Sequence, residues 1–238
     1  MLMERLTLHE VEALAHKEIP VLIPFGSVEE HGPHLPLATD VYTIYRVAEM
    51  ASREIPLLVA PPVYYGLCRS TADHPGTISI RGTVLRALTL DILSAFYRQG
   101  FKKFLLLSGH AGGTHMAFIL DAAEEFQGLK DDVVMVVASI IDLIKDCALD
   151  LIETPDDSHA GEWETSMIQY FYPELVKGKG KAEYPKFPKF QVVRNKKRYW
   201  PGGVWGDPGK ASPEKGQILA ERLAEKIILL AKELEEEV

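Results

Sequence analysis

The chain has 238 residues, of which 47% are hydrophobic and 25% charged, so it can bury a sizeable core and does not resemble a disordered protein. Its formal net charge of -8 at pH 7 disfavours nucleic acid or an anionic membrane as the main partner, because both bind basic surfaces. Cys68 and Cys147 are the only cysteines and form no C-x-x-C motif, so we expect a reducing, cytoplasmic location. We also expect no secretion signal and no membrane span, since no run approaches the ~20 apolar residues that a span needs.

Hydrophobic periodicity and turn residues predict alternating helices and strands. The Thr7 to Glu10 segment has the form of a capping box and predicts a first helix, and the apolar run 19–25 predicts a buried strand. Further strands are expected at 57–60, 104–107 and 133–140. Further helices are expected after Asp40 and at 83–97, 116–126, 162–172 and 213–236. Short apolar strands alternating with helices predict one α/β domain over 1–238, a three-layer α/β/α sandwich with a mostly parallel central sheet.

Residues 173–213 are rich in glycine, proline, lysine and aromatic residues and show no periodicity. Long segments of this kind are usually functional loops, so we predict a flap here. Its basic run at 194–198 is either a solvated loop or a rim that attracts a phosphate. Trp200 and Trp205 either pack as ordinary hydrophobic residues or cover a flat substrate.

The segment 26–40, GSVEEHGPHLPLATD, follows the first predicted strand directly. Ligands of open α/β sheets bind beyond the carboxyl ends of the strands, and this position holds Glu29, His31 and Asp40. Carboxylates and imidazoles are ligands of zinc, manganese and iron(II). Residues two apart in an extended chain point the same way, so Glu29 and His31 could share one site. The alternative is a polar loop with a helix cap at Asp40.

Two further clusters occupy comparable positions. Another predicted strand ends at His110, followed by small residues that let the backbone approach a ligand; the alternative is a tight turn with an incidental histidine. His115 is expected to be an ordinary core or surface histidine. Near the predicted helix start at 162, Glu162 and Glu164 either favour the helix dipole or join His159 as ligand and acid–base groups. Together the clusters predict a metal centre with five ligands, namely Glu29, His31, Asp40, His110 and Glu162.

Four segments resemble the creatininase (creatinine amidohydrolase) family: GSVEEHGPHLPLATD at 26–40, SGHAGG at 108–113, HAGEWETS at 159–166 and GVWGDPGKAS at 203–212. The resemblance runs from about Leu22 to the C-terminal helix. It implies an α/β sandwich, two divalent metal ions per subunit (zinc, manganese or iron(II)), a small-molecule amide substrate and a homo-oligomer, commonly a hexamer.

The resemblance also implies roles for individual residues. Glu29, Asp40 and His110 would hold one metal ion, and His31 and Asp40 the second, with Asp40 bridging. The glutamate that creatininase carries two residues after the histidine is replaced here by Gly112, and we infer that Glu162 supplies the missing carboxylate. His159 matches the histidine implicated in proton transfer. Glu164 lies in the shared ETS segment, and we predict that both are catalytic.

Several positions depart from the family pattern and leave the substrate open. Ser108 and Gly113 stand where asparagines are common, and His74 replaces a more usual aromatic residue. The sequence predicts an amidohydrolase that cleaves a cyclic amide or formamide by attack of a metal-activated hydroxide. Deformylation of a formylaminopyrimidine ribonucleotide, in flavin or deazaflavin biosynthesis, is one alternative. A metal-free phosphate- or nucleotide-binding module is another, and nucleophilic catalysis by Ser108 or Cys68 is a third.

Overall fold

A four-stranded sheet in which all strands run parallel forms the centre of the computed structural model, which describes residues 1–236. Every side chain of the two central strands is buried, because helices cover both faces of the sheet. This explains why these strands appear as continuous apolar runs. In spatial order the strands are β2 (Leu58–Val59), β1 (Val21–Phe25), β3 (Lys103–Ser108) and β4 (Val134–Ser139).

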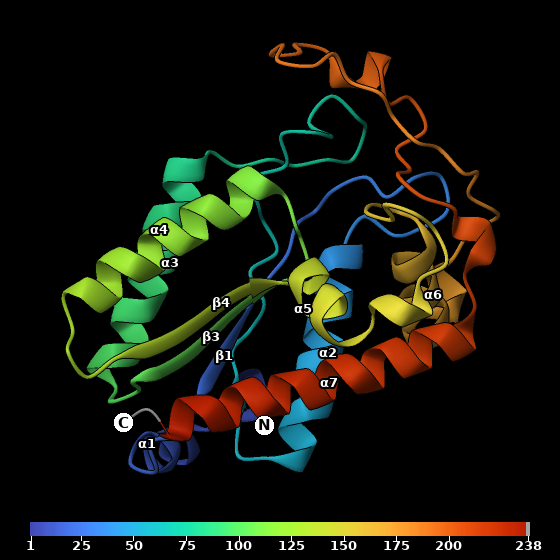
Figure 1. Ribbon diagram of the computed structural model, residues 1–238. Helices are drawn as coiled ribbons and strands as arrows, with labels where there is room; N and C mark the ends of the chain where they lie inside the picture. Colours follow the sequence, from blue (N-terminus) through green and yellow to red (C-terminus); the bar gives the residue numbers. More distant parts are fainter. Residues whose placement is uncertain (237–238) are drawn as a thin grey trace.

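The helices form two layers, one on each face of the sheet, as Figure 1 shows. Alternate strand residues point to opposite faces. Leu22 and Leu105 therefore pack in a core with α2, α5, α6 and α7, whereas Ile23 and Phe104 pack in a core with α1, α3 and α4. The predicted three-layer α/β/α sandwich is confirmed. The helices are α1 (Leu8–Ala15), α2 (Thr39–Glu54), α3 (Gly82–Arg98), α4 (Gly113–Gly128), α5 (Ile140–Cys147), α6 (Glu162–Phe171) and α7 (Pro213–Glu236).

The sequence pattern located most elements but missed α5. The predicted strand at 133–140 ends as β4 at Ser139, and α5 begins at the next residue. Ser139 and Asp142 form a capping box at this junction, with the Ser139 side chain and the Asp142 carboxylate each bonded to the other's backbone N–H. The apolar residues of β4 continue into α5 without a break, so hydrophobicity alone did not mark the change of period.

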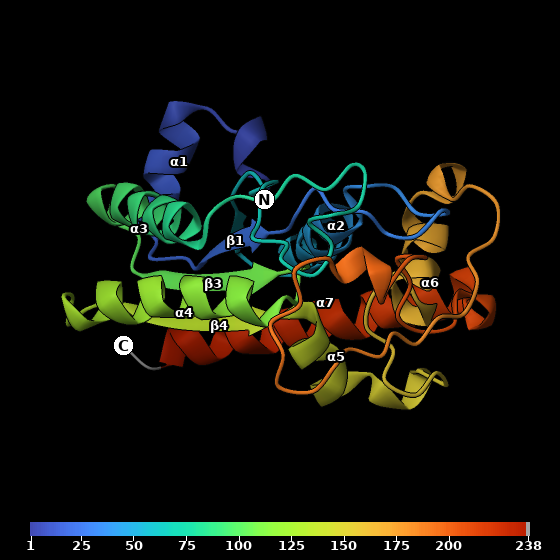
Figure 2. The same ribbon diagram turned by 90° about the horizontal axis from the view of Figure 1, so that it is seen from above.

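β1, β3 and β4 point their carboxyl ends toward α6 and the flap segment, as Figure 2 shows, and β2 runs parallel to β1. The start of α2 packs directly on the ends of β1 and β3 because the residues there are glycines. A Cβ on Gly26 would lie 2.8 Å from the backbone nitrogen of Val41, and one on Gly109 would overlap the carbonyl of Asp40. A side chain at either position would push α2 away from the strands. These two glycines therefore allow Asp40 to lie directly above the strand ends.

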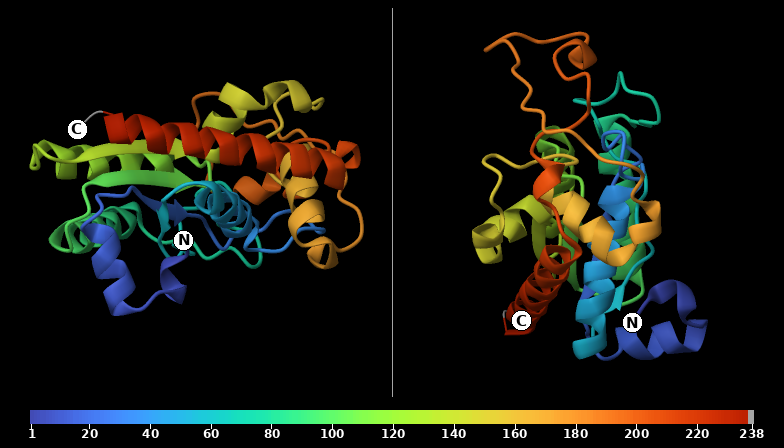
Figure 3. Two further views of the ribbon diagram at one scale, coloured as in Figure 1. Left: turned by 90° about the horizontal axis from the view of Figure 1, so that it is seen from below. Right: turned by 90° about the vertical axis from the view of Figure 1, so that its right-hand side faces the viewer.

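The flap, residues 173–213, contains only short 3-10 turns and isolated bridges, the latter joining Glu183 to Gly206 and His159 to Trp205. Its inner part is packed, since Trp200 is 3% exposed, whereas Phe190 at its outer part is fully exposed. The right-hand view of Figure 3 shows the flap at the opposite end of the molecule from the two termini. Within residues 1–236, no helix has the length and apolar character needed to span a membrane.

Candidate metal centre

The carboxylate of Asp40, in the first turn of α2, lies between two histidines from different parts of the chain. Its Oδ1 is 3.1 Å from Nε2 of His31, and its Oδ2 is 3.3 Å from Nδ1 of His110. Ser27 donates a hydrogen bond of 2.6 Å to Oδ2 and fixes the carboxylate plane. Asp40 is buried, so its charge faces these groups instead of water.

Backbone carbonyls orient both imidazoles. Nδ1 of His31 donates to the carbonyl of Glu29 at 3.0 Å, and Nε2 of His110 donates to the carbonyl of Leu67 at 3.2 Å. The opposite ring nitrogen of each histidine therefore faces Asp40. This is the arrangement of metal-binding histidines, in which an outer hydrogen bond fixes the ring and leaves the inner nitrogen to coordinate.

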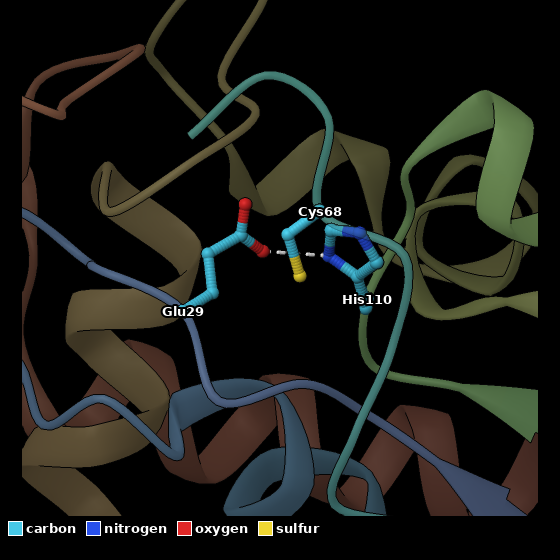
Figure 4. Close-up of side chains that lie close together, drawn as sticks. All are labelled: Glu29, Cys68 and His110. Carbon is cyan, nitrogen blue, oxygen red and sulfur yellow. Dashed lines mark ion pairs between the residues drawn. The ribbon is translucent and has the colours of Figure 1, made fainter. Parts of the chain in front are cut away.

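Glu29 joins His110 on one side of Asp40. Its Oε2 lies 2.8 Å from Nδ1 of His110, and the hydroxyls of Ser27 and Thr71 donate to the same carboxylate. Cys68 completes this group, because ligand atoms of Glu29, Cys68 and His110 all lie within 4.8 Å of one another (Figure 4). The sequence did not assign Cys68 to this group.

Glu164 joins His31 on the other side. Its Oε1 is 3.6 Å from Nε2 of His31, its second oxygen accepts from the backbone N–H of Ala160, and ligand atoms of His31, His159 and Glu164 lie within 4.8 Å of one another. The carboxylate of Asp157 accepts 2.9 Å hydrogen bonds from the first two backbone N–H groups of α6 and holds the start of this helix. The position of Glu164 therefore depends on a loop residue as well as on its helix.

The cluster concentrates negative charge in a buried space. Glu29, Asp40 and Glu164 are each 2% exposed, and among residues 1–236 their only ion-pair partners are histidines. Burial raises the pKa of the Glu29 carboxyl, but the charge and hydrogen bond of His110, together with the charge of His159, outweigh it and lower the pKa to about 2. Buried carboxylates that stay ionised need compensating positive charge. Divalent cations would supply it, and the carboxylate and imidazole donors fit zinc, manganese or iron(II).

Glu162 does not reach this cluster, so the inference that it supplies the missing carboxylate is wrong. Its carboxylate pairs with Lys215 of α7 and accepts hydrogen bonds from the backbone N–H groups of Glu153 and Thr154. Helical residues two apart point in directions roughly 200° apart. Glu164 therefore faces the histidines while Glu162 faces α7. The sequence predicted that both residues lie near the helix start, but it did not establish which of them faces the histidines.

His159 lies at the edge of the cluster, next to the flap. Its Nε2 is 2.7 Å from the carbonyl oxygen of Glu30, and its ring centroid is 4.3 Å from that of His31 and 5.1 Å from that of Trp200. The ring is therefore held between the inner histidine and the flap, and it lines the adjoining cavity.

The cavity beside the cluster has a volume of about 210 Å³. Its walls include Glu29, Asp40 and Glu164 of the cluster, the glycine-rich turn after His110, and Trp200 and Trp205 of the flap. Trp200 donates from Nε1 to the carbonyl of Val204 at 2.7 Å, and its own carbonyl accepts from His74 at 2.8 Å. His74 therefore anchors one of the aromatic residues that cover the site.

The contacts of His115 and Ser108 can also be compared with what the sequence predicts for these two residues. His115 is fully buried, accepts from the N–H of Leu67 and bonds to the hydroxyl of Ser108, as expected for an ordinary core histidine. Burial and nearby His110 lower the pKa of His115 to about 3, so its ring is neutral. Ser108 donates to the carbonyl of His110 at 2.8 Å, and this contact holds the turn instead of presenting a nucleophile.

Comparison with known proteins places this arrangement in a family. The family model described as creatininase, creatinine amidohydrolase, matches residues 4–231. The creatinine amidohydrolase of Pseudomonas putida is 30% identical over 237 residues, covering 91% of this chain and 90% of that protein. The mycofactocin precursor peptide peptidase of Mycolicibacterium smegmatis is 31% identical over 169 residues, covering 68% of this chain and 62% of that protein.

Solved structures of creatininase have the same fold. One crystal structure of creatinine amidohydrolase aligns with a TM-score of 0.87 and 26% identity, covering 98% of this chain and 97% of that one. A manganese form of creatininase aligns with a TM-score of 0.86 and 27% identity over 99% of this chain and 98% of that one. A mutant creatininase of the Zn–Zn type aligns with a TM-score of 0.82 and 26% identity, covering 99% and 97%.

The opposite orientations of the two α6 glutamates give a testable contrast. Glu164→Gln should lower the metal content of purified protein, because it removes a buried donor charge from the cluster. Glu162→Gln should leave metal content unchanged and lower the free energy of unfolding by about 1–3 kcal/mol, because the partner of the mostly buried Lys215 loses its charge. Elemental analysis and urea unfolding of both variants measure this; equal metal loss in both would contradict the assignment.

Proposed function

The chain is a member of the creatininase family and a hydrolase of carbon–nitrogen bonds other than peptide bonds, and we propose that it cleaves a small amide with two divalent metal ions. The two ions would be held by Glu29, Asp40 and His110 on one side and by His31, Asp40 and Glu164 on the other. The manganese and Zn–Zn forms of its solved relatives support this metal dependence.

The position of Asp40 is the observation that carries this proposal. Its two carboxylate oxygens face different histidines, and each histidine belongs to a different group of potential ligands. A carboxylate shared in this way is the usual bridge between paired metal ions. Such ions lower the pKa of a coordinated water toward neutrality and polarise a substrate carbonyl. Ser27 keeps the Asp40 carboxylate in place through its hydrogen bond to Oδ2.

The contacts of His159 support a role for this side chain in moving a proton at the reacting nitrogen. Nε2 is engaged by the carbonyl of Glu30, which fixes the ring while it lines the cavity between His31 and Trp200. Amide cleavage requires protonation of the leaving nitrogen, and a positioned histidine typically contributes about 10²–10⁴-fold to such a step. We therefore assign His159 the general acid role, with Glu164 serving as ligand instead of the catalytic residue that the sequence predicts.

The size of the cavity favours a small substrate. Its volume of about 210 Å³ is below the range of roughly 300–1,000 Å³ that is typical of ligand pockets. Trp163, Trp200 and Trp205 give it aromatic walls, which suit a flat amide or a small heterocycle. A cyclic amide or a formamide fits this space.

Asp40→Asn tests the metal-dependent mechanism. We expect metal affinity to fall by more than ~100-fold, because changes to residues that merely support metal ligands already cost about 10–100-fold. A screen of creatinine, formamides and ureido compounds with added zinc, manganese or iron(II) should first identify an amide that the wild-type protein hydrolyses. The Asp40→Asn protein should lose this activity together with the metal.

The exposed residue Asp121, which pairs with Arg86 on the surface, provides the matched control for this experiment. Asp121→Asn should keep both metal and activity. An active Asp40→Asn protein that contains no metal would refute the mechanism, and a wild-type protein without stoichiometric metal would favour a metal-free binding module.

His159→Asn tests the proton-transfer role. We expect kcat to fall by about 10²–10⁴-fold while KM and metal content stay close to the wild-type values, because the metal ligands are untouched. The exposed His9 supplies the control variant, His9→Asn. If His159→Asn instead loses metal in proportion to activity, His159 is a ligand and the proton comes from another group.

A neighbouring cavity favours a second candidate substrate. This cavity has a volume of about 390 Å³, shares Ser70 and Trp205 with the first, and is also lined by Lys196 of the flap. A substrate with its amide at the cluster and an anionic group toward Lys196 would occupy both. The formylaminopyrimidine ribonucleotide considered from the sequence is a substrate of this kind.

Lys196→Ala separates the two substrate classes. For a phosphorylated formamide we expect KM to rise by roughly fivefold, since a partly exposed charge pair contributes at most about 1 kcal/mol. For the same formamide without phosphate, KM should not change. Lys197→Ala, the adjacent lysine that does not line the cavity, is the control. If KM changes equally for the phosphorylated and the unphosphorylated formamide, Lys196 does not bind the phosphate. That result would leave neutral amides as the substrate class.

A further inference from the structure

We propose that Cys68 coordinates one of the two metal ions as a thiolate, together with Glu29 and His110, so that the two metal positions differ in their preferred metal. This inference rests on the proposed function, because it assumes that the cluster binds metal. It adds a sulfur ligand that the sequence pattern did not assign and that changes the chemistry of one position only.

The three side chains converge on a common point. Figure 4 shows the thiol of Cys68 beside the His110 ring, with the Glu29 carboxylate directed to the same ring. Their ligand atoms all lie within 4.8 Å of one another, and the thiol is fully buried. In a tetrahedral zinc site, bonds of ~2.1 Å to nitrogen and ~2.3 Å to sulfur place the ligand atoms roughly 3.6 Å apart. Small side-chain adjustments therefore bring all three within reach of one ion.

The backbone that carries Cys68 is fixed to the metal-binding histidine. The N–H of Leu67 donates to His115 at 3.2 Å, and the carbonyl of Leu67 accepts from His110 at 3.2 Å. The N–H of Cys68 donates to the hydroxyl of Ser79 at 2.9 Å. A Cβ on Gly66 would lie 2.7 Å from the carbonyl oxygen of Gly26, so this segment also packs closely against the loop that carries Glu29. The thiol therefore has a defined position relative to both partners.

The thiolate of Cys68 would add a sulfur ligand to the metal position beside His110. Glu29, Asp40 and His110 offer three protein ligands to this position, and the turn after His110 has glycine at 112 and 113. A side chain at Gly112 would meet the His110 ring, since a Cβ there would lie 2.6 Å from Nε2. Cys68 would raise the set to four protein ligands, and a coordinated water would then be a fifth ligand, a number that catalytic zinc sites can reach.

Thiolate coordination has a definite chemical consequence. The thiol loses its proton to solvent, the sulfur–metal bond forms, and no oxidation or reduction takes place. Thiolates select zinc, cobalt or iron(II) over manganese and magnesium, whereas carboxylate and imidazole ligands discriminate less. The position with Cys68 should therefore exclude manganese more strongly than the position with His31 and Glu164.

Cobalt(II) gives a direct spectroscopic test on the full-length protein. After loading with cobalt(II) and confirming its stoichiometry, we expect a sulfur-to-cobalt charge-transfer band in the near ultraviolet. Cys68→Ser should retain folded structure and bound cobalt but lose this band. Cys147→Ser is the matched control and should keep it, since Cys147 bonds to the carbonyl of Leu143 in α5, away from the cluster.

The outcomes separate the two proposals. The thiolate proposal is overturned if wild-type protein binds cobalt without showing the band, or if the band persists in Cys68→Ser. Either result leaves the proposed function intact. Failure of wild-type protein to bind any divalent metal overturns both. Because the wild-type spectrum alone decides the presence of a sulfur ligand, the test holds even if the Cys68→Ser protein does not fold.

Discussion

The centre of this molecule depends on one electrostatic constraint, which is that several ionised carboxylates are buried together without a lysine or arginine among residues 1–236 to pair with them. Asp40 lies between His31 and His110, and Glu29 and Glu164 extend the negative charge on either side. Burying charge is costly unless it is compensated, and among the described residues only histidines pair with these carboxylates. The cluster is therefore best understood as a cation site, and the positions of its histidines follow from that requirement.

Close backbone contacts make this cluster possible. Glycines at 26 and 109 let the start of α2 rest on the strand ends, and this contact places Asp40 at the point where β1 and β3 terminate. Outer hydrogen bonds then fix three of the candidate ligands: Ser27 orients Asp40, and backbone carbonyls orient both histidines. Precise placement of ligands by such outer contacts is what holds a metal site in a working geometry.

The flap adds selectivity to this centre. Trp200 is fixed by His74 and by the carbonyl of Val204, so it forms a defined wall over the cavity instead of a loose cover. Under the proposed function, the small volume and aromatic walls would restrict the amide end of the substrate, and the neighbouring cavity beside Lys196 would offer room for a charged extension. Reaction type and substrate choice would then be controlled by different segments of the chain.

The sequence by itself determined the α/β class, the order of most elements, and the candidate ligands Glu29, His31, Asp40 and His110, because strand ends and apolar periods are local features. Tertiary structure decided the rest. Glu164 and not Glu162 faces the histidines, because the two side chains leave α6 in opposite directions and Lys215 of α7 takes one of them. Cys68 joins Glu29 and His110 only through packing between segments distant in the chain, and no spacing rule encodes that contact.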